Sequence, residues 1–458
     1  MNLVEKDLKY IWHPCSQMKD YETLKPIVIE KGEGVYLYDI DGNKYLDAIS
    51  SWWCNLLGHS NKRINKAIND QVNKIEHVIF ANFSNIPAIE LSERLVKITP
   101  DRLEKLFFVD NGSAAVETAL KMSFHYHQQL GKVKKKRFVA ITDAYHGETL
   151  AALSMSDLDI YSKVYKPLML DTIRVTGPDC YRCSFNKDRD TCNSECFIDM
   201  QKKIEDKHEE ISAIIIEPML QGAAGMKIYS PMYLKKLREL CDKYDINLIA
   251  DEIAVGFGRT GKMFACEHAD ISPDIMCISK GLTAGYLPMA ITMTSNKIYD
   301  VFYGDYNENK AFLHSHTYSG NALGCAVALE VLKIFEEENI LEMVNKKGKL
   351  LNDLLKKELR DHPLVGEIRN IGMINGIELV RNKNTKDGFP SEMRVGYEIF
   401  KIALKKGVLL RPLGNVIYFN PPYVISEEEM IELVIKCKES IDLWEITENN
   451  DTLSYKGK

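Results

Sequence analysis

The chain of 458 residues lacks a long uncharged apolar run. Its longest uncharged stretch, Gly281–Asn296, is interrupted by glycine, proline and threonine, whereas a membrane-spanning helix needs about 20 predominantly apolar residues in a row. The first ten residues carry charges where a secretory signal peptide has its apolar segment. We therefore expect a cytoplasmic protein that neither crosses a membrane nor binds one.

An excess of positive charge is also missing. The formal net charge is −6, which provides no basic field for nucleic acid or for an anionic membrane surface, so small soluble substrates are expected. The eleven cysteines are odd in number and scattered along the chain. They fit a reducing compartment better than a disulfide framework.

The stretch 247–285 organises the rest of the chain. Two short apolar runs, Asn247–Ala250 and Ile275–Ile278, are each followed almost at once by one charged residue, Asp251 and Lys280. Such runs suit strands buried on both faces, and α/β proteins place their chemistry beyond the carboxyl ends of these strands. An acid and an amine are therefore expected to meet in one crevice. On spacing alone, a structural ion pair is favoured over a catalytic pair.

The surrounding residues change this interpretation. The segment DEIAVGFGRTG (251–261), with Asp274 and SKG (279–281), resembles the signature of the class III pyridoxal-phosphate-dependent aminotransferases. The resemblance implies an α/β fold of fold-type I, with a mostly parallel central sheet and a smaller α+β domain. It also implies that Lys280 carries pyridoxal phosphate as a Schiff base and then acts as a general base. Asp251 would keep the pyridine nitrogen protonated, so that the ring accepts electrons.

Two further predicted strand ends carry candidate cofactor residues. Leu106–Val109 ends before a small-residue turn and a helix that begins near Gly112 and Ser113. A helix start is a ready anion site, although taken alone the turn would more simply be an ordinary helix cap. By resemblance, Gly112 and Ser113 hold the cofactor phosphate. Tyr145 follows the strand Arg137–Ile141 and, by resemblance, stacks on the pyridine ring and borders the substrate site.

Supporting roles are expected for two further residues, His146 and Glu217. His146 is expected to pack or to form a hydrogen bond, since Lys280 already supplies the base. Glu217 follows the predicted strand Ala213–Ile216 and is expected to order the neighbouring loop.

The segments IWHP (11–14) and SSWW (50–53) resemble one branch of class III, the 7,8-diaminopelargonic acid synthases of biotin synthesis. The resemblance implies that Trp52 lines the substrate pocket. Both tryptophans could instead be core or interface anchors. In an extended segment, however, neighbours face opposite ways, so one could pack while the other walls a pocket. Cys15 departs from the branch, whose well-known members have a tyrosine directly after the proline.

By resemblance, the segment 315–317 lies at a dimer interface. Thr317 would reach across to the phosphate bound by the other subunit of a homodimer, with Ser315 and His316 beside the pocket. Several synthases have glycine and proline where Ser315 and His316 stand. Arg411 matches the arginine that grips substrate carboxylates, for which its planar fork is well suited.

The branch implies conversion of 8-amino-7-oxononanoate to 7,8-diaminononanoate. Most members use S-adenosylmethionine as the amino donor and a minority use lysine; the aromatic wall of Trp52 favours the sulfonium donor, whereas Cys15, Ser315 and His316 leave lysine open. One alternative is another ω-aminotransferase, acting on ornithine, γ-aminobutyrate or a diamine. A cofactor-binding regulator is a non-enzyme alternative, but neither the arm before Ser50 nor the tail has room or charge for a helix-turn-helix.

Four cysteines, Cys180, Cys183, Cys192 and Cys196, lie within one polar segment. Such spacing could bind zinc or an iron–sulfur cluster. The chemistry of the class needs no metal, so we predict no metal site and a surface loop of reduced thiols.

The length predicts two or three domains. Residues 1–60 are expected to form an N-terminal arm and a small β unit that joins the small domain, and residues 61–321 the large cofactor-binding domain. Residues 322–446 are expected to form the C-terminal small domain, and residues 447–458 a disordered tail.

Overall fold

The computed structural model describes residues 1–455, with side chains described as far as Ile446. The helices are α1 (Leu3–Tyr10), α2 (Ser50–Trp53), α3 (Lys62–Val72), α4 (Ile86–Ile98), α5 (Gly112–Gln129), α6 (Leu150–Met155), α7 (Asp159–Ser162), α8 (Ile198–Lys207), α9 (Pro231–Tyr244), α10 (Asn296–Tyr299), α11 (Ala322–Glu337), α12 (Ile340–Leu359), α13 (Val395–Lys405) and α14 (Glu427–Tyr455). The strands are β1 (Ile29–Glu33), β2 (Tyr36–Asp39), β3 (Lys44–Asp47), β4 (Lys105–Val109), β5 (Arg137–Ile141), β6 (Thr172–Val175), β7 (Ile211–Ile216), β8 (Leu220–Gln221), β9 (Lys227–Ile228), β10 (Asn247–Asp251), β11 (Ile275–Ile278), β12 (Ala290–Thr294), β13 (Val365–Ile371), β14 (Ile374–Leu379), β15 (Val408–Leu409) and β16 (Val416–Phe419).

A seven-stranded sheet forms the centre of the large body, in the order β4-β12-β11-β10-β7-β5-β6. Its strands run parallel except β12, which is antiparallel to both of its neighbours. The prediction of a mostly parallel sheet is therefore confirmed. Strand β12 was not predicted. Its residues lie in the uncharged stretch Gly281–Asn296, which was considered only as a possible membrane span.

The sheet is buried on both faces, as the continuous apolar runs predict. In β7, Ala213 and Ile215 belong to the core cluster that includes α5 residues such as Ala115. The alternate residues, Ile214 and Ile216, belong to the larger core on the other face. Because successive side chains point to opposite faces, an uninterrupted apolar run satisfies both cores at once.

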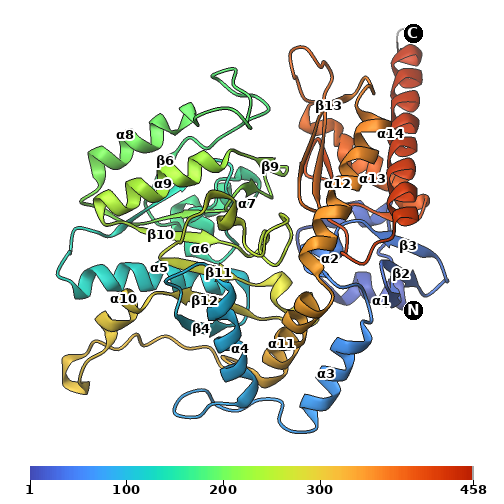
Figure 1. Cartoon of the computed structure of the whole chain (residues 1–458). Coiled ribbons are helices and arrows are strands. Elements are labelled where there is room, and N and C mark those ends of the chain that lie inside the picture. The colour runs from blue at the N-terminus through green and yellow to red at the C-terminus, as the bar shows by residue number, and fades with distance from the viewer. Residues whose placement is uncertain (456–458) are drawn as a thin grey trace.

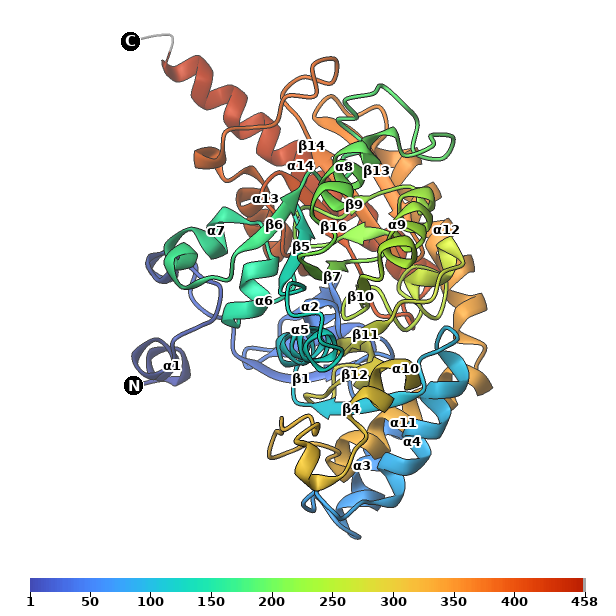
Figure 2. The same cartoon turned by 90° about the vertical axis from the view of Figure 1, so that its left-hand side faces the viewer.

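The N-terminal and C-terminal regions of the chain together form the smaller body, which lies beside the central sheet (Figure 1). The N-terminal strands β1, β2 and β3 are antiparallel, and β15 joins β3 in parallel, so the C-terminal region completes the N-terminal sheet. A second antiparallel sheet has the order β13-β14-β16. Turned by 90°, the fold shows α1 projecting from the rest of the molecule (Figure 2).

The last helix differs from the sequence prediction. Helix α14 continues to Tyr455, through residues 447–455 of the predicted disordered tail, and residues 456–458 lie outside the described part. No glycine or proline interrupts the chain before Gly457, so local sequence provides no stop signal. The domain boundaries themselves remain predictions. No helix in residues 1–455 has the length and apolar content that a membrane crossing requires.

Candidate active site

The parallel strands bring the predicted acid and amine to one edge of the sheet. Asp251 is the last residue of β10, and Lys280 begins a short 3-10 helix (Lys280–Thr283) just after β11. The two strands are adjacent and parallel, with Asp251 opposite Cys277. Their carboxyl ends therefore open into the same crevice, as expected for α/β sheets.

Asp251 is held rigidly on both carboxylate oxygens. It is only 5% exposed. The Nδ1 atom of His146 lies 2.7 Å from Oδ2, and the backbone N–H of Ile253 donates to Oδ1 at 3.1 Å. The Nε2 atom of His146 is buried without a hydrogen-bond partner in the described residues. A carboxylate anchored in this way presents its charge in one fixed place.

Lys280 lies in a setting that favours the neutral amine. Burial lowers the pKa of its ammonium group, although the charge of Asp251 partly opposes this shift. Its Nζ atom is 4.8 Å from the ring centroid of Trp53, and within residues 1–446 no group hydrogen-bonds this atom. The backbone of Lys280 has a positive φ of 41°. An amine of lowered pKa that has no hydrogen-bond partner is a nucleophile available for covalent chemistry.

The start of α5 has the features expected of an anion site. Asn111 caps the helix by accepting from the Ala114 N–H at 3.0 Å. Gly147 lies against the first turn with φ of 123°, and a Cβ atom there would come within 2.1 Å of Ser113 Oγ. The close approach and the positive φ both require glycine. The N-terminal N–H groups at Gly112 and Ser113 have no intrahelical partner and can hold a phosphate.

Glu217 connects two loops of the site, as predicted. It accepts hydrogen bonds from the N–H of Tyr145 at 3.1 Å and from the N–H of Gly222 at 3.0 Å. Burial raises the pKa of this carboxyl to about 7. The hydroxyl of Tyr145 donates to Glu148 at 2.9 Å, which fixes its ring at the border between the crevice and the large cavity.

The SSWW segment is not extended, so that expectation is wrong. Its residues 50–53 all have positive φ, of 50°, 47°, 86° and 71°, and form a left-handed turn. Such a turn costs roughly 1–2 kcal/mol per residue. The expected separation of the two tryptophans nevertheless occurs: Trp53 is 6% exposed and donates from its indole to Tyr418 at 2.9 Å, whereas Trp52 is 41% exposed and lines the cavity.

Asp47 stabilises this strained turn. Its fully buried carboxylate accepts from the N–H of Ile49 at 3.2 Å, from the N–H and hydroxyl of Ser51 at 3.0 and 2.7 Å, and from His59 Nε2 at 3.0 Å. Burial alone would raise the pKa of Asp47, but the hydrogen bonds from His59 and Ser51 hold it below the usual value. These contacts offset the backbone strain and determine where both indoles point.

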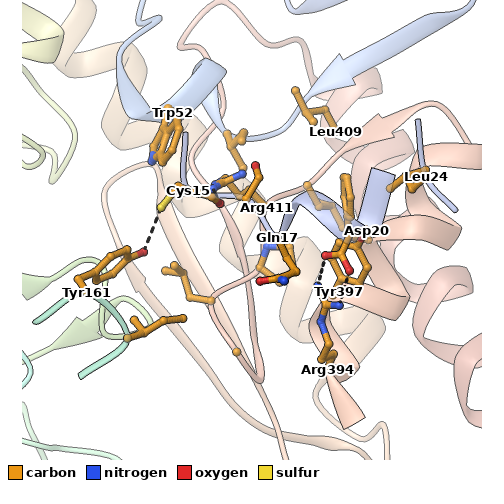
Figure 3. A pocket seen from close by; sticks show the side chains of 18 of the residues that line it. Cys15, Gln17, Asp20, Leu24, Trp52, Tyr161, Arg394, Tyr397, Leu409 and Arg411 are labelled. Atoms are coloured by element: carbon orange, nitrogen blue, oxygen red, sulfur yellow. Dashed lines mark hydrogen bonds and ion pairs between the residues drawn. The ribbon is translucent and has the colours of Figure 1, made fainter. Parts of the chain in front are cut away.

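A large cavity of about 1410 Å³ lies beside the crevice. Its lining includes the N-terminal arm, the segment around α7 and the small body, with Trp52 and Arg411 on one wall (Figure 3). The guanidinium of Arg411 lies 4.2 Å from the Trp52 ring centroid and donates to the carbonyl of Cys15 at 3.1 Å. Lys280 and Asp251 are not among its lining residues.

The predicted interface residues lie at the surface of the subunit. Ser315 and Thr317 are exposed, and His316 between them is half-buried. His316 Nδ1 contacts Asp110 Oδ2 at 2.7 Å, just before the turn that starts α5. This contact places the segment close to the start of α5.

A family model described as Aminotransferase class-III matches residues 17–441. The chain belongs to the class-III aminotransferases. It is 45% identical over 437 residues to the adenosylmethionine-8-amino-7-oxononanoate aminotransferase of Geobacter sulfurreducens, which covers 95% of this chain and 96% of that one. The crystal structure of the enzyme of that name from Methanocaldococcus jannaschii has a TM-score of 0.91 at 42% identity, covering 96% of this chain and 98% of that one. An omega transaminase of Pseudomonas jessenii, solved with PMP, has a TM-score of 0.92 at 35% identity. The match covers 97% of this chain and 98% of that one.

This aminotransferase therefore has the fold-type I architecture and is a pyridoxal phosphate enzyme of small-molecule substrates. The described residues fit the cofactor. The anchored carboxylate of Asp251 suits a protonated ring nitrogen, the unpaired amine of Lys280 suits the aldehyde, and the α5 start suits the phosphate. Bound pyridoxal phosphate supplies an electron-accepting ring.

Sequence reasoning expected His146 to pack or to form a hydrogen bond, and its contact with Asp251 confirms this expectation. Other residues that support the aminotransferase site were missed. Asp47 and His59 were not considered, because a single Asp or His in a chain carries no local signal of a buried turn. Glu148 was passed over although it follows Tyr145 closely and contacts its hydroxyl.

The cysteine loop holds only free thiols. All eleven cysteines of the aminotransferase are unpaired. Burial raises the pKa of Cys180 to about 12 and of Cys196 to about 11. Within the described residues, no three His, Cys, Asp or Glu side chains are arranged to hold a metal ion.

Proposed function

We propose that this aminotransferase transfers an amino group to 8-amino-7-oxononanoate, giving 7,8-diaminononanoate for biotin synthesis, with S-adenosylmethionine as the amino donor. The likeness over nearly the whole chain to relatives named for this donor and this acceptor carries the proposal. The cavity supports it: an exposed indole suits a sulfonium and an adenine, and Arg411 offers a fork for a carboxylate.

The proposed roles follow from the positions of the side chains. Lys280 would hold the cofactor, release it to the substrate amine, and then move the proton from the substrate Cα. Asp251 would hold the ring nitrogen in its protonated form, with His146 fixing the carboxylate. Arg411 would bind the carboxylates of donor and acceptor, which occupy the site in turn. Tyr145 would stack on the ring and border the substrate.

The donor is tested by a half-reaction without acceptor. Purified enzyme is mixed separately with S-adenosylmethionine, lysine, ornithine and alanine, and the visible absorbance of the bound cofactor is followed. We expect loss of absorbance with S-adenosylmethionine alone. Loss with lysine alone would assign lysine as the donor and retain the acceptor. Loss only with ornithine or alanine would support the general ω-transaminase alternative, which the Pseudomonas jessenii structure favours, and no loss at all would support a regulator.

The proposal includes a cytoplasmic homodimer with active sites at the interface. Several large apolar side chains are strongly exposed in the single chain, among them Ile79 at 60%, Phe83 at 63% and Leu313 at 92%. These segments flank the exposed Thr317, which would reach the phosphate site of the partner subunit. Covering this apolar surface is a reason for the subunits to associate.

Subunit mixing tests whether Thr317 acts across the interface. Dimers of Thr317→Ala are expected to bind the cofactor about 10-fold more weakly, because a hydrogen bond to a charged group is lost. A hybrid of one Lys280→Ala subunit and one Thr317→Ala subunit then contains one intact site. Its activity should exceed that of either parent at limiting cofactor. A hybrid no more active than the Thr317→Ala dimer would place Thr317 in the site of its own subunit.

A further inference from the structure

Tyr161 faces the substrate cavity from α7, opposite the wall that carries Trp52 (Figure 3). Its ring centroid is 5.5 Å from that of Tyr145, and the two rings are tilted by 58°. The side chain therefore lies next to the tyrosine that borders the reacting group. The mechanism described above gives Tyr161 no role.

The hydroxyl of Tyr161 has an unusual partner. The Cys15 thiol donates to the phenolic oxygen at 3.7 Å, and this weak contact is the only hydrogen bond of the hydroxyl within residues 1–446. The phenolic O–H therefore has no hydrogen-bond acceptor within residues 1–446. Burial, followed by the contact with Cys15, raises the pKa of Tyr161, so the group remains a neutral donor at physiological pH.

Cys15 contacts both this hydroxyl and Arg411. Its carbonyl accepts from the Arg411 guanidinium at 3.1 Å, while its thiol contacts Tyr161. Its backbone is in the left-handed region, with φ of 53°. One arm residue thus lies between two donors of the cavity, the guanidinium and the phenol. Arg411 uses one of its five N–H groups for this contact and keeps the others for a ligand.

We propose that Tyr161 is a further substrate-binding residue, whose phenolic O–H donates to the α-carboxylate of the amino donor. This inference rests on the proposed function. In an α-amino acid the carboxylate is bonded to the reacting carbon, so it must lie near Tyr145, as Tyr161 does. In 8-amino-7-oxononanoate the carboxylate is separated from the ketone carbon by a chain of methylene groups. Tyr161 therefore distinguishes the donor from the acceptor.

The test is Tyr161→Phe, which keeps the ring and removes only the hydroxyl. In the donor half-reaction, we expect the concentration of S-adenosylmethionine for half-maximal rate to rise about 10-fold, as for loss of one hydrogen bond to a charged group. The acceptor half-reaction, started from enzyme loaded with pyridoxamine phosphate, should remain within about two-fold of the wild type. Equal effects on both halves, or no effect on the donor half, would overturn the proposal.

Decarboxylated S-adenosylmethionine sharpens this test, because it retains the amine and the sulfonium but lacks the carboxylate. Wild type and Tyr161→Phe should use it equally; a persisting 10-fold difference would show that the hydroxyl serves another group. If the wild type itself does not react with S-adenosylmethionine, the proposed function has failed, and the comparison is then made with the α-amino acid that does react.

Two control variants separate the hydroxyl from the packing of the arm. Cys15→Ala removes the thiol but keeps the backbone carbonyl that Arg411 contacts, so a smaller effect than that of Tyr161→Phe is expected. Equal loss in both variants would assign the effect to closure by the arm and overturn the proposal. Tyr303→Phe, at a residue that is 75% exposed, should have the same half-reaction rates as the wild type. The unfolding temperature and the visible spectrum verify that each variant is folded and contains the cofactor.

Discussion

Replacing Lys280 with alanine is expected to lower turnover by at least about 10³-fold and to abolish the visible absorbance of the attached cofactor. The variant loses both the nucleophile and the general base, and a positioned base alone contributes about 10²–10⁴-fold. Absorbance spectra and single-turnover rates measure the two losses. Turnover within ten-fold of the wild type, or an unchanged spectrum, would contradict the assignment of Lys280.

Lys135 provides a matched control for this substitution. Lys135 is a buried lysine, 8% exposed, and its ammonium donates to the carbonyls of His208, Ile211 and Tyr244 at 2.9, 3.1 and 3.2 Å. Lys135→Ala should leave the cofactor absorbance and the turnover of the folded fraction intact. It should lower the free energy of unfolding, because three backbone carbonyls, one of them fully buried, lose their donor.

In the protein without cofactor, Lys280→Ala should raise the free energy of unfolding, whereas Lys135→Ala should lower it. Burial lowers the pKa of Lys280 from its usual 10.5, so between the folded and unfolded pKa values the unfolded chain binds more protons than the folded chain. The free energy of unfolding of the wild type therefore rises with pH between the folded and unfolded pKa values. Below pH 10.5 the apo variant should be the more stable, and its advantage should shrink as the pH approaches that value. Urea unfolding at several pH values measures this difference.

Asp251→Asn is expected to reduce turnover by about 10²–10³-fold, the range found when a preorganised electrostatic partner of the reaction is removed. The amide has the shape of the carboxylate but not its charge, so it cannot hold a protonated ring nitrogen. Cofactor affinity should fall as well, and rapid-mixing rates of the donor half-reaction should show the loss in the proton-transfer step. A turnover close to that of the wild type would remove Asp251 from the chemistry.

Asp442→Asn is the matched control for this second variant. Asp442 also pairs with a histidine, His362, whose Nε2 lies 3.0 Å from its Oδ1. This pair joins the segment after α12 to α14, and neither residue lines the large cavity. The control should affect stability alone. Comparable loss of turnover in both variants would indicate a general effect of breaking an Asp–His pair.

The sequence by itself determined which segments meet at the carboxyl edge of the central sheet. Continuous apolar runs ending at Asp251 and before Lys280 imply strands buried on both faces, and parallel neighbours necessarily bring such ends together. Gly112 and the small residues that follow it imply a helix start that can hold an anion. These features depend on local pattern and on the general geometry of α/β sheets, so they can be read without coordinates.

The tertiary structure alone decided how these residues are supported. The left-handed backbone of residues 50–53 is unfavourable for local reasons and is stabilised because Asp47, itself held by His59, accepts hydrogen bonds from Ile49 and Ser51. His146 meets Asp251 across 105 residues of sequence, and Cys15 meets Tyr161 across 146. No local pattern encodes such pairs, because each depends on where the packing of whole elements brings two distant side chains.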